Sequence, residues 1–296
     1  METYRLQVCR ARALCFLRHS FHGTFGVHYR SFAASPWLRD FVRCHWDFES
    51  ACVTAGQRLH IVPDGGVSMV FHCADSYWQY LDKGRGLIQP QAFLIRPSGQ
   101  PLVLEALGKS VLFATRFQPH GWIQLTGLQE VLPANMALAL DVVLGAPGAA
   151  LADAVLHASC SAARLAEVEA FLCRFLCRHE VRPDPAVQTA VKAIVSGNEA
   201  FRQVTALALH AGTSCRQLER KFARQVGISP KQLIRLNRVQ NAIRQMQSQS
   251  FSSLTELAQQ VHFYDQAHFI KDFKTLTHMT PRQFQQSQVQ MSLFHT

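Results

Sequence analysis

The sequence predicts an α+β protein with a β-rich N-terminal half and an all-α C-terminal third. In residues 27–144, short apolar runs alternate with Gly and Pro turns, a pattern typical of a small β-barrel or sandwich with helices. Apolar residues then recur at helical spacing in the middle of the chain. In the last third, one helical unit occurs twice: Phe222 is matched by Phe273, and Pro230 by Pro281, each 51 positions later.

The length and the charge distribution indicate a two-domain protein with an anionic partner. The chain has 296 residues, of which 48% are hydrophobic, so it is long enough for two domains and too apolar to be disordered. Its formal net charge is +10, and residues 186–296 contain 13 basic and 5 acidic residues. A basic excess confined to one segment is the electrostatic footprint of a nucleic-acid-binding domain.

The cysteines and the apolar runs indicate a cytoplasmic protein. The nine cysteines are an odd number without a C-x-x-C pair, which predicts reduced thiols. No apolar run reaches the ~18 residues that a membrane-spanning helix needs, so no membrane partner is expected. Arg12 and Arg18 interrupt the apolar stretches near the N-terminus. Residues 1–26 are therefore expected to be a loose extension without fixed structure, or to precede the true start.

Residues 27–144 are predicted to form one β-rich domain. Strands are expected at residues 44–48, 67–72, 93–96, 102–105 and 111–117, with a short helix at 36–42 and another helix beginning at Gly121. Between the first two strands, Pro63-Asp64-Gly65-Gly66 is a turn signal.

Residues 145–197 are predicted to be a helical linker and dimerisation region. One helix face carries apolar residues at three- and four-residue steps, namely Leu165, Val168, Leu172, Phe175 and Leu176. Such a stripe most often packs in the core of its own chain, and the alternative is a subunit interface. After a break at 181–185 and a second helix at 186–195, a short linker leads to the basic domain at 198–296.

The first helical unit has the pattern helix, tight turn, helix. Its helices are expected at residues 204–211 and 215–226, with Ser214 as N-cap of the second helix and Gly227 at its end. Leu218 and Phe222 fix this helix to the core, so Arg216, Glu219 and Arg220 lie outward. A recognition helix presents such a face to the major groove, where Arg bridges guanine and Glu accepts from cytosine. The alternative is a solvated charged face.

The second unit repeats this arrangement. Its helices are expected at residues 254–260 and 266–275, and Asp265 is the expected N-cap. The outward positions are Gln266, Ala267, Ile270 and Lys271. Gln pairs with adenine, and Ala or Ile contacts a thymine methyl group. A connecting helix of about 17 residues, ~25 Å long, is expected at 231–247. It would hold the two recognition helices about one turn of DNA apart, ~34 Å, so that one chain reads two successive major grooves.

Three segments of this region resemble the AraC/XylS family of bacterial transcription regulators. They are Gly227-Ile228-Ser229-Pro230, and the run His262 to Phe269 together with Met279 to Phe284. The resemblance covers residues 201–284 and implies a seven-helix domain with two helix-turn-helix units. It also implies base contacts from the outward positions, which here are Arg216, Glu219, Arg220, Gln266, Ala267, Ile270 and Lys271.

This sequence departs from the family pattern at two positions. The family usually has glycine where this chain has His262 and His278. Histidine tolerates a positive φ better than most residues, at a cost on the order of 1 kcal/mol. The second unit is therefore expected to be less stable than the first, or slightly re-aimed.

The N-terminal half resembles the cupin-like sensor domain of one branch of this family. The resemblance rests on Val62 to Gly66 and on Arg116 to Gly121. It implies a small-molecule pocket inside the barrel. The candidates to line it are Trp46, Met69, Phe71, Phe113 and Phe117, and the alternative for each is a plain core position.

The sequence therefore predicts a sequence-specific DNA-binding transcription regulator that responds to an effector through its N-terminal domain. No catalytic residue, cofactor or metal is expected. The expected partners are double-stranded promoter DNA, a small-molecule effector, RNA polymerase if the protein is an activator, and a second copy in a homodimer. One alternative is a metal-dependent cupin-type enzyme using His60, Asp64 and His72, although these lack a compact ligand spacing. Another is a non-specific nucleoid-type DNA binder.

Overall fold

The structure is a computed structural model that describes residues 17–23, 27–50, 58–81, 84–97, 99–128, 132–178, 184–248 and 251–286. The chain divides into two compact units. Residues 1–58, 67–96 and 104–183 make up the first unit, and residues 59–66, 97–103 and 184–296 make up the second.

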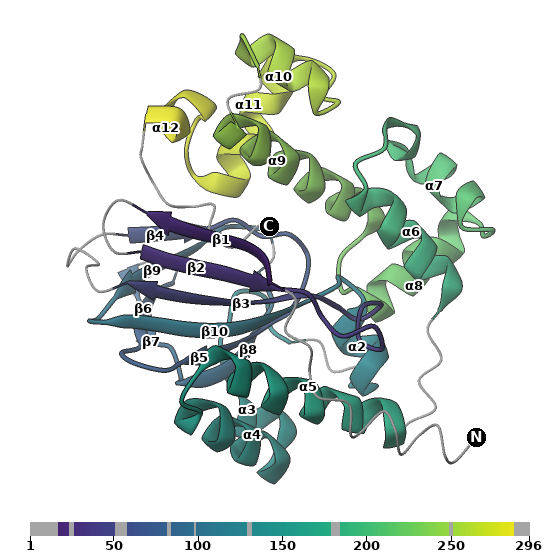
Figure 1. Cartoon of the computed structure of the whole chain (residues 1–296). Helices are drawn as coiled ribbons and strands as arrows, with labels where there is room; N and C mark the ends of the chain where they lie inside the picture. The colour runs from purple at the N-terminus through teal and green to yellow at the C-terminus, as the bar shows by residue number, and fades with distance from the viewer. Residues whose placement is uncertain are drawn as a thin grey trace. The chain divides into compact units, whose positions relative to one another are not determined.

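A seven-stranded sheet forms the first unit, with strand order β1-β2-β3-β10-β5-β8-β11 (Figure 1). The strands are β1 Leu17–Gly23, β2 Val27–Phe32, β3 Val42–Ser50, β5 Ser68–His72, β8 Ala92–Ile95, β10 Ser110–Phe117 and β11 Leu138–Ala139. β10 is central, since Ala114 pairs with Trp46 of β3 and with Val70 of β5, both antiparallel. Four of the predicted strands are confirmed here to within two residues at each end.

A second sheet contains four short strands in the order β4-β9-β6-β7. They are β4 Arg58–Ile61, β6 Tyr77–Tyr80, β7 Gly86–Ile88 and β9 Leu102–Ala106. Of these only β9 was predicted, because strands of three or four residues give too short an alternation to recognise. Two sheets followed by helices confirm the predicted α+β fold class.

The described part of the first unit also contains four α-helices, which are α2 Gly121–Thr126, α3 Leu140–Leu144, α4 Ala146–His157 and α5 Ser161–Arg178. Leu165, Val168 and Leu172 of α5 are buried in one hydrophobic cluster with Met69 and Phe71 of the sheet. The apolar stripe of α5 is therefore core of its own unit, as the more common interpretation predicted. The helix expected from Gly121 is confirmed as α2.

Two expectations for the N-terminal region were wrong. Residues 36–41 form successive turns rather than a helix, with hydrogen bonds from Leu38 N to Ser35 O and from Phe41 N to Leu38 O, and residue 42 already belongs to β3. The segment predicted as a loose extension contains β1, which pairs antiparallel with β2. The backbone groups of β1 form hydrogen bonds with β2, and sequence patterns do not reveal such a partner strand. The remainder of that extension, residues 1–16 and 24–26, lies outside the described residues.

The second unit is helical, and its described part contains seven α-helices, the number that the family resemblance implied. They are α6 Pro185–Val195, α7 Val204–His210, α8 Cys215–Gln225, α9 Pro230–Ser248, α10 Leu254–Gln260, α11 Gln266–Thr277 and α12 Pro281–Gln286, with a 3-10 turn, η2, at Glu199–Phe201 (Figure 1). Every helix predicted from the repeat is present, within two residues at each end.

α6 belongs to this unit and not to the linker in which the sequence placed it. Its Val187, Ala190, Val191 and Ile194 are buried in the same hydrophobic cluster as Phe222. Sequence patterns located the helix correctly but gave no sign of the core to which it contributes.

A short segment between β4 and β5 also packs in the second unit. Val62 is fully buried in its core, and Gln240 of α9 donates hydrogen bonds of 3.1 Å to the carbonyl oxygens of Val62 and Pro63. Gly65 has a φ of +85°, and a Cβ atom there would lie 2.6 Å from Cδ1 of Leu233. A side chain at this position would strain the backbone and push the Leu233 side chain aside, so glycine is favoured here.

The described part of the chain contains six cysteines, and none of them is in a disulfide. Cys44 and Cys173 are buried in the core, whereas Cys160 is exposed. Within the described residues, no helix is both long and apolar enough to cross a membrane.

Candidate nucleic-acid interface

The first helix-turn-helix unit consists of α7, a four-residue turn at 211–214 and α8. The side chain of Ser214 caps α8 by accepting a hydrogen bond from the backbone N–H of Gln217 at 3.3 Å. Leu218 and Phe222 are completely buried beneath the helix. Gly212 in the turn has a φ of +63°, a conformation that glycine adopts at little cost.

The outward face of α8 carries the residues that the sequence assigned to base contact. Arg216, Glu219 and Arg220 are all exposed. None of the three forms an ion pair with another described residue of the chain. Their charges are therefore available to an external partner.

The second unit consists of α10, a turn and α11. Asp265 caps α11, and its carboxylate accepts from the N–H of His268 at 2.7 Å. Phe269 and Phe273 are completely buried in place of Leu218 and Phe222. These rings extend an aromatic row, with centroid separations of 5.3 Å from Phe263 to Phe269 and 5.6 Å from Phe269 to Phe273.

The predicted contact positions of α11 differ in exposure. Ala267 and Lys271 are exposed, whereas Gln266 and Ile270 are half-buried. The amide oxygen of Gln266 accepts a hydrogen bond from the Thr255 hydroxyl at 3.0 Å, and Ile270 packs partly against the core. The structure thus brings four predicted residues onto one helix face but leaves only two of them fully accessible.

The extra residue of the second unit is Tyr264. The backbone N–H of Thr213 bonds the carbonyl of Ala208, and that of Phe263 bonds Ala258 in the same way, both at 2.9 Å. The first unit then needs one residue to reach its N-cap, whereas the second needs two. The additional residue has its side chain 94% exposed at the start of α11. In the sequence, its signal is a change of repeat spacing: Ala208 is matched by Ala258, 50 positions later, whereas Phe222 is matched by Phe273, 51 positions later.

Both predicted departures from glycine occupy left-handed backbone positions. His262 has a φ of +62° and His278 a φ of +60°. His278 is the C-cap of α11, and its N–H donates to the carbonyl of Lys274 at 2.9 Å. The sequence comparison therefore identified these two strained positions correctly.

The expected pocket residues of the first unit form part of its core. Met69, Phe71, Phe113 and Phe117 are at most 1% exposed and pack together, which is the core role that the sequence left open for each of them. Trp46 is also buried, and it stacks on Tyr29 at 6.2 Å.

A groove of about 320 Å³ lies elsewhere in the first unit, between β8, α3 and α4. Its lining residues are Pro90, Gln91, Ala92, Ala139, Leu140, Asp141, Ala149, Ala152 and Leu156. Four of these are alanines, so the groove is bounded by small apolar side chains, with Gln91 and Asp141 as its polar groups. Its volume falls at the lower end of the range for small-molecule sites.

The residues of the metal-enzyme alternative do not form a ligand cluster. Among the described residues, no group of three His, Cys, Asp or Glu side chains is placed to hold a metal ion. His72 bonds Gln89 at 3.2 Å, and burial lowers its pKa to about 4, so the ring is neutral near pH 7. Asp64 instead accepts from the N–H of Gly66 at 2.9 Å within its own turn.

Comparison with known families identifies two domains. A family described as a helix-turn-helix domain matches residues 207–287. A family described as a domain of unknown function (DUF6597) matches residues 30–132. No curated protein matches the chain.

Several solved structures are similar in part or along most of the chain. An AraC-type transcriptional regulator from Chromobacterium violaceum is 25% identical, with 36% of this chain and 94% of that chain covered and a TM-score of 0.33. ToxT from Vibrio cholerae O395 is 14% identical over 77% of this chain and 94% of that chain, with a TM-score of 0.45. The AraC-like transcriptional activator CuxR is 13% identical over 84% of this chain and 91% of that chain, with a TM-score of 0.33.

The assignment rests on the family match and on the two units, which share their helices, caps and buried anchors. The match from residue 207 to 287 begins in α7 and includes both recognition helices. The chain thus carries an AraC-type helix-turn-helix domain at its C-terminus and is a DNA-binding transcription regulator.

Proposed function

We propose that this regulator reads a specific promoter sequence with α8 and α11 in two successive major grooves. The observation that supports this best is that two capped, core-anchored helices expose polar faces and flank one connector. That connector, α9, has 19 residues, which corresponds to ~28 Å and is comparable to the ~34 Å turn of DNA. The proposed base-contacting residues are Arg216, Glu219, Arg220, Gln266, Ala267, Ile270 and Lys271.

The two recognition helices would contribute unequally to specificity. Arg216 and Arg220 each have a guanidinium group that can bridge O6 and N7 of guanine, and each such pair is worth about 1–3 kcal/mol of discrimination. Gln266 needs both its amide oxygen and its nitrogen for a bidentate contact with adenine. Its oxygen already accepts from Thr255, so one of the two acceptor positions of that oxygen is used before DNA binds.

The experiment is to select DNA sites from a random pool with the purified full chain and then to measure a footprint. Arg220→Ala combined with Lys271→Ala should weaken binding to the selected site about 10²-fold, because one contact is lost in each groove. The matched control is Arg85→Ala combined with Lys109→Ala, which removes the same charge from exposed positions of the first unit. A footprint unchanged by the first pair would contradict the base-contact assignment.

The same DNA distinguishes a specific regulator from a nucleoid-type binder. A specific reader should bind the selected site about 10³-fold or more tightly than random DNA of equal length. Both affinities should fall steeply with salt, because each phosphate contact releases counterions. Equal affinity for the two DNAs would identify a non-specific binder.

We also propose that the N-terminal domain binds a small-molecule effector. The groove between β8, α3 and α4 supports a compact, mostly apolar molecule with a polar group facing Gln91 or Asp141. Ala152→Phe should fill the groove and abolish the effector's influence on DNA binding while leaving basal DNA binding intact. Native mass spectrometry of the purified protein would detect a retained ligand, and an unchanged effector response in the variant would place the site elsewhere.

The finer features of this function follow from its being a DNA-binding regulator. The proposal places the protein in the cytoplasm, as a homodimer that acts by binding and not by catalysis. RNA polymerase is its further partner where it activates transcription. Sedimentation with and without the selected DNA would test the dimer, and a monomer under both conditions would contradict it.

A further inference from the structure

The two recognition helices each carry a charged residue that does not belong to the outward face. Lys221 of α8 and Asp272 of α11 occupy equivalent positions, 51 apart, directly after Arg220 and Lys271. Their side chains are 33% and 10% exposed. Because successive residues of a helix differ by about 100°, these side chains turn away from the face assigned to DNA.

Both inward charges are paired with another helix of the same unit. Lys221 Nζ lies 2.9 Å from Oδ2 of Asp184 and donates to its Oδ1 at 3.0 Å. Asp272 Oδ1 lies 2.9 Å from a guanidinium nitrogen of Arg235 on α9. The position has therefore kept an ion pair while its charge has been reversed between the two copies.

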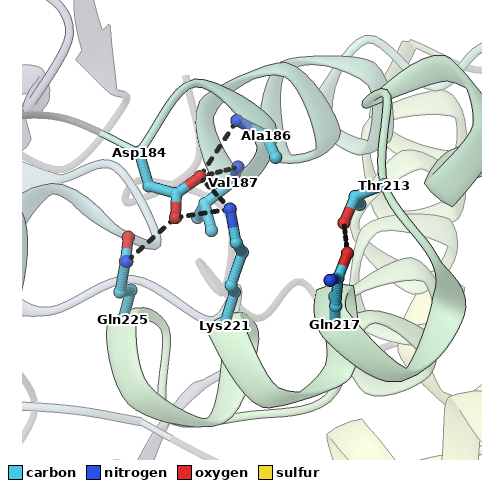
Figure 2. A network of polar contacts seen from close by, with 7 residues as sticks. All are labelled: Asp184, Ala186, Val187, Thr213, Gln217, Lys221 and Gln225. Carbon is cyan, nitrogen blue, oxygen red and sulfur yellow. Dashed lines mark hydrogen bonds and ion pairs between the residues drawn. The ribbon is translucent and has the colours of Figure 1, made fainter.

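Asp184 connects two helices through one carboxylate, as Figure 2 shows. It is the N-cap of α6, where Oδ1 accepts from the N–H groups of Ala186 at 3.1 Å and Val187 at 3.3 Å. From below, Lys221 and Gln225 of α8 point at the same group, with Gln225 at 3.4 Å from Oδ2. Five donor contacts thus converge on a single side chain.

The hydrogen bonds to the Asp184 carboxylate favour its charged form. Burial would raise the pKa of Asp184, but the hydrogen bond from Lys221 and those from the α6 backbone outweigh burial and lower it. The group is therefore charged at neutral pH. The backbone cap fixes the carboxylate, so it provides a fixed point for the longer side chains of α8.

The apolar anchors of α8 do not set its rotation to the same degree. Leu218 and Phe222 are buried, and hydrophobic contacts are non-directional. Hydrogen bonds to a charged group are directional and favour one geometry. A rotation of α8 about its axis would move Lys221 away from Asp184 and, at the same time, turn the outward arginines.

We propose that Asp184 is a positioning residue for DNA recognition: through Lys221 it fixes the rotation of α8 and so the aim of Arg216 and Arg220. The proposal rests on the proposed function of these arginines as base contacts. Asp184 is also the first residue of the longest segment of the helical unit, residues 184–296. The point at which the chain enters the DNA-binding unit is thus the point that orients its first recognition helix.

The test uses the full chain and a DNA site selected by the wild-type protein. Asp184→Asn retains a good N-cap residue but removes the charge. It should weaken binding about tenfold and reduce discrimination at the bases read by Arg216 and Arg220. Discrimination at the bases that Lys271→Ala affects should stay unchanged, because α11 is anchored separately by Arg235. Equal loss of discrimination at the bases read by α8 and at those read by α11, or no loss at either, would overturn the proposal.

Companion variants separate positioning from folding and from loss of charge. Lys221→Met should weaken DNA binding as much as Asp184→Asn does, whereas Lys221→Arg should keep most of the wild-type affinity. The double variant Asp184→Asn with Lys221→Met should bind DNA no more weakly than either single variant. Lys231→Met removes an exposed lysine of α9 and should leave base discrimination intact. Additive losses in the double variant would show that the two residues act independently and would overturn the proposal.

Failure of this proposal and failure of the proposed function give different results. If no DNA site can be selected, the function as a specific reader fails. If a site is selected and Arg220→Ala weakens it but Asp184→Asn does not, only the positioning role fails.

Discussion

The two helix-turn-helix units have the same backbone plan and stabilise it by different means. The first has glycine at its left-handed positions, Gly212 and Gly227, and a serine cap. The second has His262 and His278 at those positions, and an aspartate cap that accepts a shorter hydrogen bond, 2.7 Å compared with 3.3 Å in the first unit. The same backbone plan is thus stabilised by low backbone strain in the first unit and by stronger side-chain contacts in the second.

Aromatic packing is the clearest compensation in the second unit. Phe273 lies 5.6 Å from Phe269 and 5.5 Å from Phe284 of α12, both in edge-to-face geometry. Such pairs contribute about 0.5–1.5 kcal/mol beyond the area that they bury. Two pairs are sufficient to offset two histidines at positive φ, each costing on the order of 1 kcal/mol.

The largest expected effect is therefore Phe273→Ala. Because the ring is completely buried and in contact with two others, its removal should cost about 3–5 kcal/mol. Hydrogen exchange of peptides from α10 to α12 in the full chain would measure this. Tyr264→Ala, at an exposed position of the same unit, should change exchange by less than about 0.5 kcal/mol. Equal effects would contradict the role given to the aromatic row.

Exchanging residues at the left-handed positions should have a smaller effect. Gly212→His should destabilise the first unit by about 1–2 kcal/mol, the cost of a side chain in this conformation. His278→Gly should relieve the strain of a side chain at positive φ, but glycine also has more conformational freedom in the unfolded chain, so the net stabilisation of the second unit should be less than about 1 kcal/mol. Hydrogen exchange of α8 and α11 peptides would compare the two. Stabilisation by Gly212→His would refute the strain argument.

Removing the N-cap of α11 should have a smaller effect still. Asp265→Ala should cost about 1 kcal/mol, since the N–H of His268 loses its acceptor. Asp265→Ser should restore most of that loss, because serine holds this role in the first unit. The readout is exchange of the first turn of α11, and no change in the alanine variant would exclude a capping role.

The smallest expected effect is a dependence on pH. The pKa of Asp184 is below its ordinary value in the folded state, so its contribution is complete above the unfolded value of ~4 and is lost as pH falls through the folded value. The stability difference between wild type and Asp184→Asn should thus be present at pH 7 and shrink below about pH 4. Urea unfolding at several pH values would test this, and a constant difference would contradict it.

Much of the second unit was predictable because its information is local. Short-range patterns predicted the N-caps Ser214 and Asp265, the end of α8 shortly before Gly227, and the helix bounds. These patterns occur in both copies of the repeat. The outward positions of α8 followed from helical periodicity alone. For α11 the same reasoning was less complete, because Thr255 engages Gln266 and the core covers part of Ile270.

The first unit was predicted less completely, for a physical reason. Strands of three or four residues, such as β7, carry too few alternations to be recognised. The turns at 36–41 were predicted as a helix but have no continuing ladder of helical hydrogen bonds. β1 exists by pairing with β2, and no local pattern announces such a partner.

The sequence by itself determined the fold class, the helices of the repeat and the outward face of α8, because periodicity and capping act over a few residues. Only the tertiary structure decided which charges stay outward. Arg220 and Lys221 are neighbours of equal charge, yet one is exposed and the other is bound to Asp184, 37 positions earlier. Pairing over such a distance depends on how α6 and α8 pack, and no periodicity within either helix encodes it.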